Sequence, residues 1–144
     1  MWGYPTKGRG QNITNIFHGN NLKNLIQILQ SYNSKKYITS EILCTDLKSI
    51  KGLGISTMSK FAYFLGVEID GLRSLILDLK IIEVINQEKF EEINTLKGIS
   101  HSNAPRKYTE YLRLLAALSD KLNVQPDQIE MFLFIFGQNL SNPH

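Results

Sequence analysis

Apolar residues recur at spacings of three and four along most of the chain, and this spacing predicts amphipathic α-helices. The two longest stretches cover 20–32 and 108–122. Shorter stretches with the same spacing cover 39–50, 56–65 and 79–85, with a short helix or turn at 90–96. No segment alternates apolar and polar residues clearly enough to predict a strand. We therefore predict an all-α fold.

Residues at the ends of these stretches support the helix assignments. Thr39 or Ser40 can cap the helix that follows, and Gly66 can end the helix at 56–65. Asp78 is a preferred N-cap residue for the helix that begins at Leu79. Pro126 suits the first position of the last helix.

Three further features concern the last helix and two loops. The stretch 131–136, MFLFIF, is apolar nearly all round, so we expect a central, buried helix there. Asp70-Gly71 predicts a turn in a connecting loop. His101 falls in the polar loop 97–105, where a histidine is more often solvated than catalytic.

The segment from Leu47 to Leu65 contains the most informative local motif. A short apolar helix leads into Gly52-Leu53-Gly54, and a second helix follows at once with Ser56 and Thr57. Glycine adopts positive φ freely and has no Cβ to block an approaching group. The second helix presents free N–H groups and the positive end of its dipole. This pattern predicts a helix-hairpin-helix that binds a DNA phosphate.

The domain organisation follows from where the helices begin. Residues 1–19 are rich in glycine and irregular, and residues 20–144 are predicted to form one helical domain. The aromatic and basic residues of the lead-in either pack on this domain or contact nucleic acid.

Composition narrows the possible functions only slightly. The 144 residues carry a net charge of +3, which permits nucleic-acid binding without requiring it. Three histidines and one cysteine give neither a zinc pattern nor a disulfide framework, and a lone cysteine suits a reducing, cytoplasmic location. No apolar run is long enough for a membrane helix.

The hairpin and the residues after it together resemble a known family. Ile50-Lys51-Gly52-Leu53-Gly54 gives the hairpin, and Leu75-Ile76-Leu77-Asp78 gives an apolar run followed by a capping Asp. This order resembles the helix-hairpin-helix DNA glycosylase superfamily, with most similarity to bacterial proteins of the 8-oxoguanine DNA glycosylase fold. Lys51 stands where the family commonly has Pro, and family members usually carry more N-terminal helices. The resemblance therefore implies an all-α glycosylase fold that lacks N-terminal helices.

The resemblance implies roles for individual residues. Asp78 corresponds to the catalytic carboxylate. The family's nucleophilic Lys aligns with Ser56, which favours a monofunctional glycosylase, and Lys60 lies one turn further along as the alternative nucleophile. Residues expected to contact the DNA backbone are Lys48, Lys51, Gly52, Leu53, Gly54, Ser56 and Thr57. The hairpin carbonyls of this family often hold a monovalent cation, and no other cofactor is expected.

The sequence is compatible with two functions. The first is base excision repair, in which the protein binds double-stranded DNA and hydrolyses the N-glycosidic bond of a damaged base such as 8-oxoguanine. The second is a non-catalytic DNA-binding or assembly module that has the hairpin but no pocket for a base. The sequence leaves the oligomeric state open between monomer and dimer.

Overall fold

The computed structural model describes residues 14–137 and residue 139. The described chain is mostly helical, which confirms the predicted all-α class. Its helices are α2 (Asn20–Lys35), α3 (Ser40–Ser49), α4 (Ile55–Leu65), α5 (Leu79–Asn86), α6 (Ala104–Leu122), α7 (Pro126–Phe136) and the 3-10 helix η1 (Glu91–Leu96). Residues 14–16 form a further short helical turn. The other residues of the predicted lead-in, 1–13, lie outside the described residues.

Local residue chemistry places most helix ends where the sequence predicts them. Thr39 caps α3, since its side chain accepts a hydrogen bond from Ile42 N at 3.3 Å. Gly66 ends α4 in the left-handed conformation with φ +66°. Pro126 occupies the first turn of α7, and a reciprocal capping box joins Gln125 and Gln128.

The structure also contains a small sheet that the sequence pattern did not predict. Strand β2 (Glu68–Ile69) pairs in parallel with β1 (Tyr37–Ile38) and antiparallel with β3 (Leu72–Arg73). The turn between β2 and β3 is the predicted Asp70-Gly71, and both residues have positive φ, as in a type I′ hairpin. Each strand has only two residues, which is too short to show alternation.

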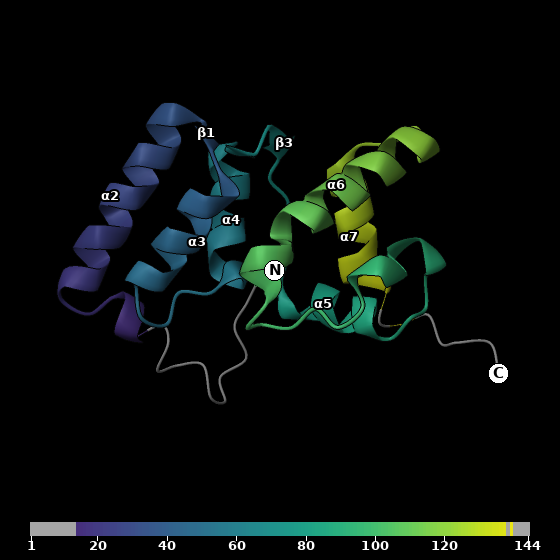
Figure 1. Ribbon diagram of the computed structural model, residues 1–144, viewed down its shortest axis with the longest axis horizontal. Helices are drawn as coiled ribbons and strands as arrows, with labels where there is room; N and C mark the ends of the chain where they lie inside the picture. Colours follow the sequence, from purple (N-terminus) through teal and green to yellow (C-terminus); the bar gives the residue numbers. More distant parts are fainter. Residues whose placement is uncertain (1–13, 138, 140–144) are drawn as a thin grey trace.

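In Figure 1 the helices form two groups, which are joined by the chain from β3 to α5 and by the packing of α3 against α6. In this view α2, α3 and α4 lie at the left, α6 and α7 lie at the right, and α5 lies below and between them. Helix α3 packs against α6, and α5 packs against α7. Among the described residues, no helix is long and apolar enough to cross a membrane.

Helix α7 is not the buried, central helix that its composition predicts. Met131, Phe132, Ile135 and Phe136 are 42–52% exposed, whereas Leu133 is buried. The buried face of α7 instead carries Glu130 and Leu133, and Gly137 just after the helix continues this face at helical spacing. Gly137 lies so close to Val84 of α5 that a Cβ on it would be 2.7 Å from a Val84 methyl carbon. An all-apolar run does not specify which face is buried, so the prediction was wrong.

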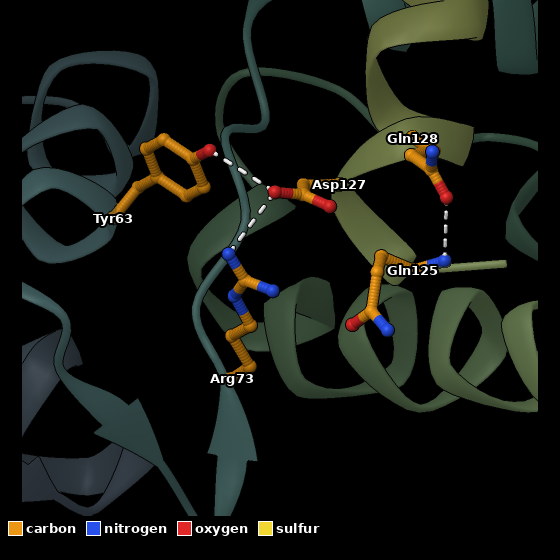
Figure 2. A network of polar contacts seen from close by, with 5 residues as sticks. All are labelled: Tyr63, Arg73, Gln125, Asp127 and Gln128. Carbon is orange, nitrogen blue, oxygen red and sulfur yellow. Dashed lines mark hydrogen bonds and ion pairs between the residues drawn. The ribbon is translucent and has the colours of Figure 1, made fainter.

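A polar network on the surface connects the two groups of helices (Figure 2). Asp127 at the start of α7 accepts hydrogen bonds from Arg73 of β3 at 3.0 Å and from Tyr63 of α4 at 3.3 Å. The Arg73–Asp127 ion pair is partly exposed, so it contributes little to stability. The ion pair connects the start of α7 to β3, and the Tyr63 hydrogen bond connects it to α4.

Candidate functional site

A tight turn joins α3 to α4 at the position of the predicted hairpin. Helix α3 ends at Ser49, and the chain turns so that Leu53 N donates to Ile50 O at 3.2 Å. Gly52 has φ +85°, a conformation that side-chain-bearing residues rarely adopt. The side chains of Ile50 and Leu53 are buried and anchor the turn on the core. The turn is therefore a fixed element between the two helices.

The start of α4 has the properties of an anion site. Gly54 is the N-cap, with no side chain to accept the first N–H groups. The first helical bond runs from Met58 N to Gly54 O at 3.0 Å. The N–H groups of Ile55 and Ser56 are consequently among those that a helix leaves without an acceptor of its own. Helix α4 begins at Ile55, one residue before the predicted start.

The predicted contact residues differ in what they present at the surface. Lys48 in the last turn of α3 and Lys51 within the turn are exposed, and they add positive charge there. Gly52, Gly54, Ser56 and Thr57 are half-buried. Leu53 is 7% exposed and its N–H is bonded within the turn, so it supports the hairpin from inside.

His101 packs directly on this hairpin, although sequence reasoning gave it no role. A Cβ placed on Gly54 would lie 2.5 Å from His101 Cε1 and 3.1 Å from Nε2, so the imidazole fills the space beside the Gly54 backbone. His101 itself remains exposed. The approach depends on α3 packing against α6, where Cys44 Sγ also contacts Pro105 O at 3.5 Å. No local sequence signal predicts this contact.

Asp78 occupies the N-cap of α5, as predicted. Its Oδ1 accepts hydrogen bonds from Lys80 N at 3.0 Å and Ile81 N at 3.2 Å, and the residue is 9% exposed. The preceding residue, Leu77, donates its N–H to Ser59 Oγ on α4 at 3.0 Å. Lys60 follows Ser59 and is half-buried. The backbone leading to Asp78 therefore lies against the second helix of the hairpin.

Side chains from α6 and α4 hold the extended run 74–77 before Asp78. Tyr108 Oη bonds to both backbone polar groups of Leu75, and Tyr111 Oη donates to Ile76 O at 2.9 Å. All four residues of the run are buried. These side chains make hydrogen bonds with the backbone that a neighbouring strand would make in a sheet. Burial raises the pKa of both tyrosine hydroxyls, which therefore act as neutral donors.

A second buried carboxyl group lies near Asp78. Glu130 on α7 is 2% exposed, and one of its carboxyl oxygens has no hydrogen-bond partner. Burial raises its pKa to about 7, the neighbouring charges of Asp127 and Asp78 add to the increase, and a hydrogen bond with the Ile76 backbone opposes it. Sequence reasoning missed Glu130, although a charged residue directly before the apolar run 131–136 is a detectable signal.

Surface hollows among the described residues lie elsewhere. The hollow between η1, α6 and α7 has a volume of about 410 Å³, and the hollow between α2 and α3 has about 510 Å³. The third, of about 370 Å³, lies between Tyr63 and α7. Asp78 lines none of these three.

Comparison with known proteins identifies the family. A family model described as "Putative 8-oxoguanine DNA glycosylase OGG-like protein" matches residues 1–134, a range that includes the hairpin, Asp78 and Glu130. The chain belongs to this family. Membership confirms the resemblance to 8-oxoguanine DNA glycosylases and points to DNA repair, with DNA as the partner, at a general level. Neither the curated proteins nor the solved structures provide a match.

Proposed function

We propose that this protein binds duplex DNA through the hairpin and releases a damaged base, with 8-oxoguanine as the first candidate. The observation that carries the proposal is that one family match spans both the hairpin and Asp78. The packing of Leu77 on Ser59 supports it, since this contact holds the Asp78 backbone against the helix that would bind the phosphate.

The hairpin would bind the DNA backbone without reading its sequence. The N–H groups at the start of α4 donate to phosphate oxygens, while Lys48 and Lys51 supply positive charge. Extruding one nucleotide from the duplex costs about a few kcal/mol, which is least for a damaged base. A fixed phosphate beside the extruded nucleotide orients its sugar toward the protein.

Asp78 would then act on the sugar. Cleavage of the N-glycosidic bond leaves the bonding electrons on the base and positive charge on the sugar. A nearby carboxylate stabilises that charge and can accept the proton of the attacking water. Because the cap bonds in the structure use Oδ1, Oδ2 is the atom that we assign to this role.

An assay on DNA that contains one 8-oxoguanine tests this proposal. Hot alkali cleaves the strand wherever the base has been released, so the wild-type protein is expected to give one defined product. Asp78→Asn keeps an oxygen for the α5 cap and removes the charge, so it should abolish product while duplex binding is retained. Asp120→Asn, an exposed acid on α6, is the matched control.

The position of Ser56 favours hydrolysis without a covalent intermediate. Borohydride should therefore trap no protein–DNA adduct. If an adduct forms in the wild type and disappears in Lys60→Ala, Lys60 is the nucleophile and the enzyme is bifunctional. A lysine nucleophile attacks as its neutral amine.

A non-catalytic DNA-binding module is the second candidate. The burial of Asp78 favours it, because a 9% exposed carboxylate is covered in the free protein. In that case the protein binds duplex DNA but gives no alkali-labile product with any lesion in a panel. A monovalent cation at the carbonyls of residues 51–53 is compatible with either function, since carbonyl oxygens suit hard cations.

A further inference from the structure

The loop that carries His101 is held firmly in place. Asn86 Nδ2 donates to Ile99 O at 2.8 Å, and Gly98 N donates to Asn86 Oδ1 at 2.9 Å. Asn103 closes the loop through bonds with Ser100 N at 2.8 Å and Gly98 O at 3.0 Å. Ile99 is 1% exposed and anchors the loop in the core. The position of His101 is thus set by its neighbours even though its ring reaches solvent.

The ring of His101 lies beside the N-cap of α4, where the proposed phosphate would bind. Its Cε1 and Nε2 atoms face the Gly54 backbone. A neutral imidazole always has one N–H donor, so the group can donate to a phosphate oxygen without a change of charge. The exposed ring therefore adds a side-chain donor to a helix start that otherwise offers backbone donors.

We propose that His101 is a DNA-contact residue that donates a hydrogen bond to the phosphodiester backbone beside Gly54. This inference rests on the proposed function, because it concerns the same hairpin. It adds a contact from a loop that precedes α6, about 47 positions along the chain from Gly54. The hairpin and the loop 97–103 then form the two sides of one phosphate site.

Substitutions at His101 can separate hydrogen bonding from space filling. His101→Phe keeps a ring over Gly54 but has no donor, whereas His101→Gln keeps an N–H donor and loses the ring. Binding to a short fluorescent duplex at fixed salt is the measurement. We expect the Phe variant to bind about tenfold more weakly and the Gln variant to remain within about threefold of the wild type. His18→Phe, in an exposed turn, is the control.

The possible results lead to distinct conclusions. Wild-type affinity in His101→Phe would overturn the contact and leave the ring as a packing group. Equal weakening in the Phe and Gln variants would also overturn it, since the donor would not be what matters. Thermal unfolding of each variant checks that the fold is intact. A wild-type protein that binds no duplex would overturn the proposed function itself, and this contact with it.

Discussion

The two glycines of the hairpin differ in what opposes a side chain at their position. Gly52 has φ +85°, so a side chain there is strained whatever space surrounds it. Gly54 has an ordinary φ of −113°, but the His101 ring occupies the place of its Cβ. The sequence shows only that both positions are glycine. The structure shows that backbone strain opposes a side chain at Gly52, whereas contact with the His101 ring opposes one at Gly54.

Stability measurements on combined variants test this distinction. Gly52→Ala and Gly54→Ala should each destabilise the protein, the first by about 1–2 kcal/mol. Adding His101→Ala should restore most of the stability lost in Gly54→Ala, because the clash is removed, and should leave the Gly52→Ala loss unchanged. Urea unfolding of the single and double variants gives these values. Equal rescue of both glycine variants would contradict the interpretation.

Glu130 should make stability depend on pH. Its carboxyl pKa is raised by burial to about 7 from an ordinary value near 4.5. The folded protein therefore binds this proton more tightly than the unfolded chain does. The stabilisation that proton binding to Glu130 contributes is fully present below about pH 4.5 and is lost as the pH rises to about 7. The total decline corresponds to about 3 kcal/mol.

Replacing the carboxyl group tests that dependence. Glu130→Gln keeps an oxygen that can accept from Ile76 N, and it should remove the decline between about pH 4.5 and pH 7. Glu92→Gln, an exposed acid in η1, should leave the decline in place. Denaturant unfolding across this pH range is the measurement, and an unchanged slope in Glu130→Gln would show that another group is responsible.

The run 74–77 depends on α6 for its backbone hydrogen bonds. Tyr108 satisfies both Leu75 N and Leu75 O, while Tyr111 satisfies Ile76 O alone. The run ends at Asp78, so the same bonds position the start of α5. Packing of α6 thereby contributes to the geometry of the candidate site.

Removing the hydroxyl groups should reveal this role. Tyr108→Phe leaves two buried backbone groups unpaired and should cost about 2–4 kcal/mol, against about 1–2 kcal/mol for Tyr111→Phe. Tyr37→Phe, with 48% exposure, should cost less than about 0.5 kcal/mol. Thermal or urea unfolding of the three variants gives the order of their losses in stability. A Tyr108→Phe variant as stable as the wild type would mean that water or rearrangement satisfies the Leu75 backbone.

For the whole molecule, the sequence predicts the helices and the local motif but not how distant segments meet. Helical spacing, Gly66 and Asp78 are local signals, and the structure agrees with them. The sheet was missed because pairing between Tyr37 and Glu68 is non-local and each strand is short. The contact of His101 with Gly54 likewise depends on helix packing, which periodicity does not contain.

The proposed DNA-binding face has a testable electrostatic property. Lys48 at the end of α3 and Lys51 within the hairpin are exposed, so each is expected to neutralise about one phosphate. The variant Lys48→Gln/Lys51→Gln should bind duplex DNA more weakly, and the slope of log affinity against log salt should become shallower by about two. Lys23→Gln/Lys35→Gln removes the same charge from exposed positions on α2 and is the control.

The comparison of the two double variants decides whether binding is local to the hairpin. If both change the slope equally, the net positive charge of the protein drives DNA binding and the hairpin has no special part. If only the hairpin variant changes it, the phosphates lie against the turn between α3 and α4. Retention of the full slope in the hairpin variant would place the DNA on another face of the molecule, away from both Asp78 and His101.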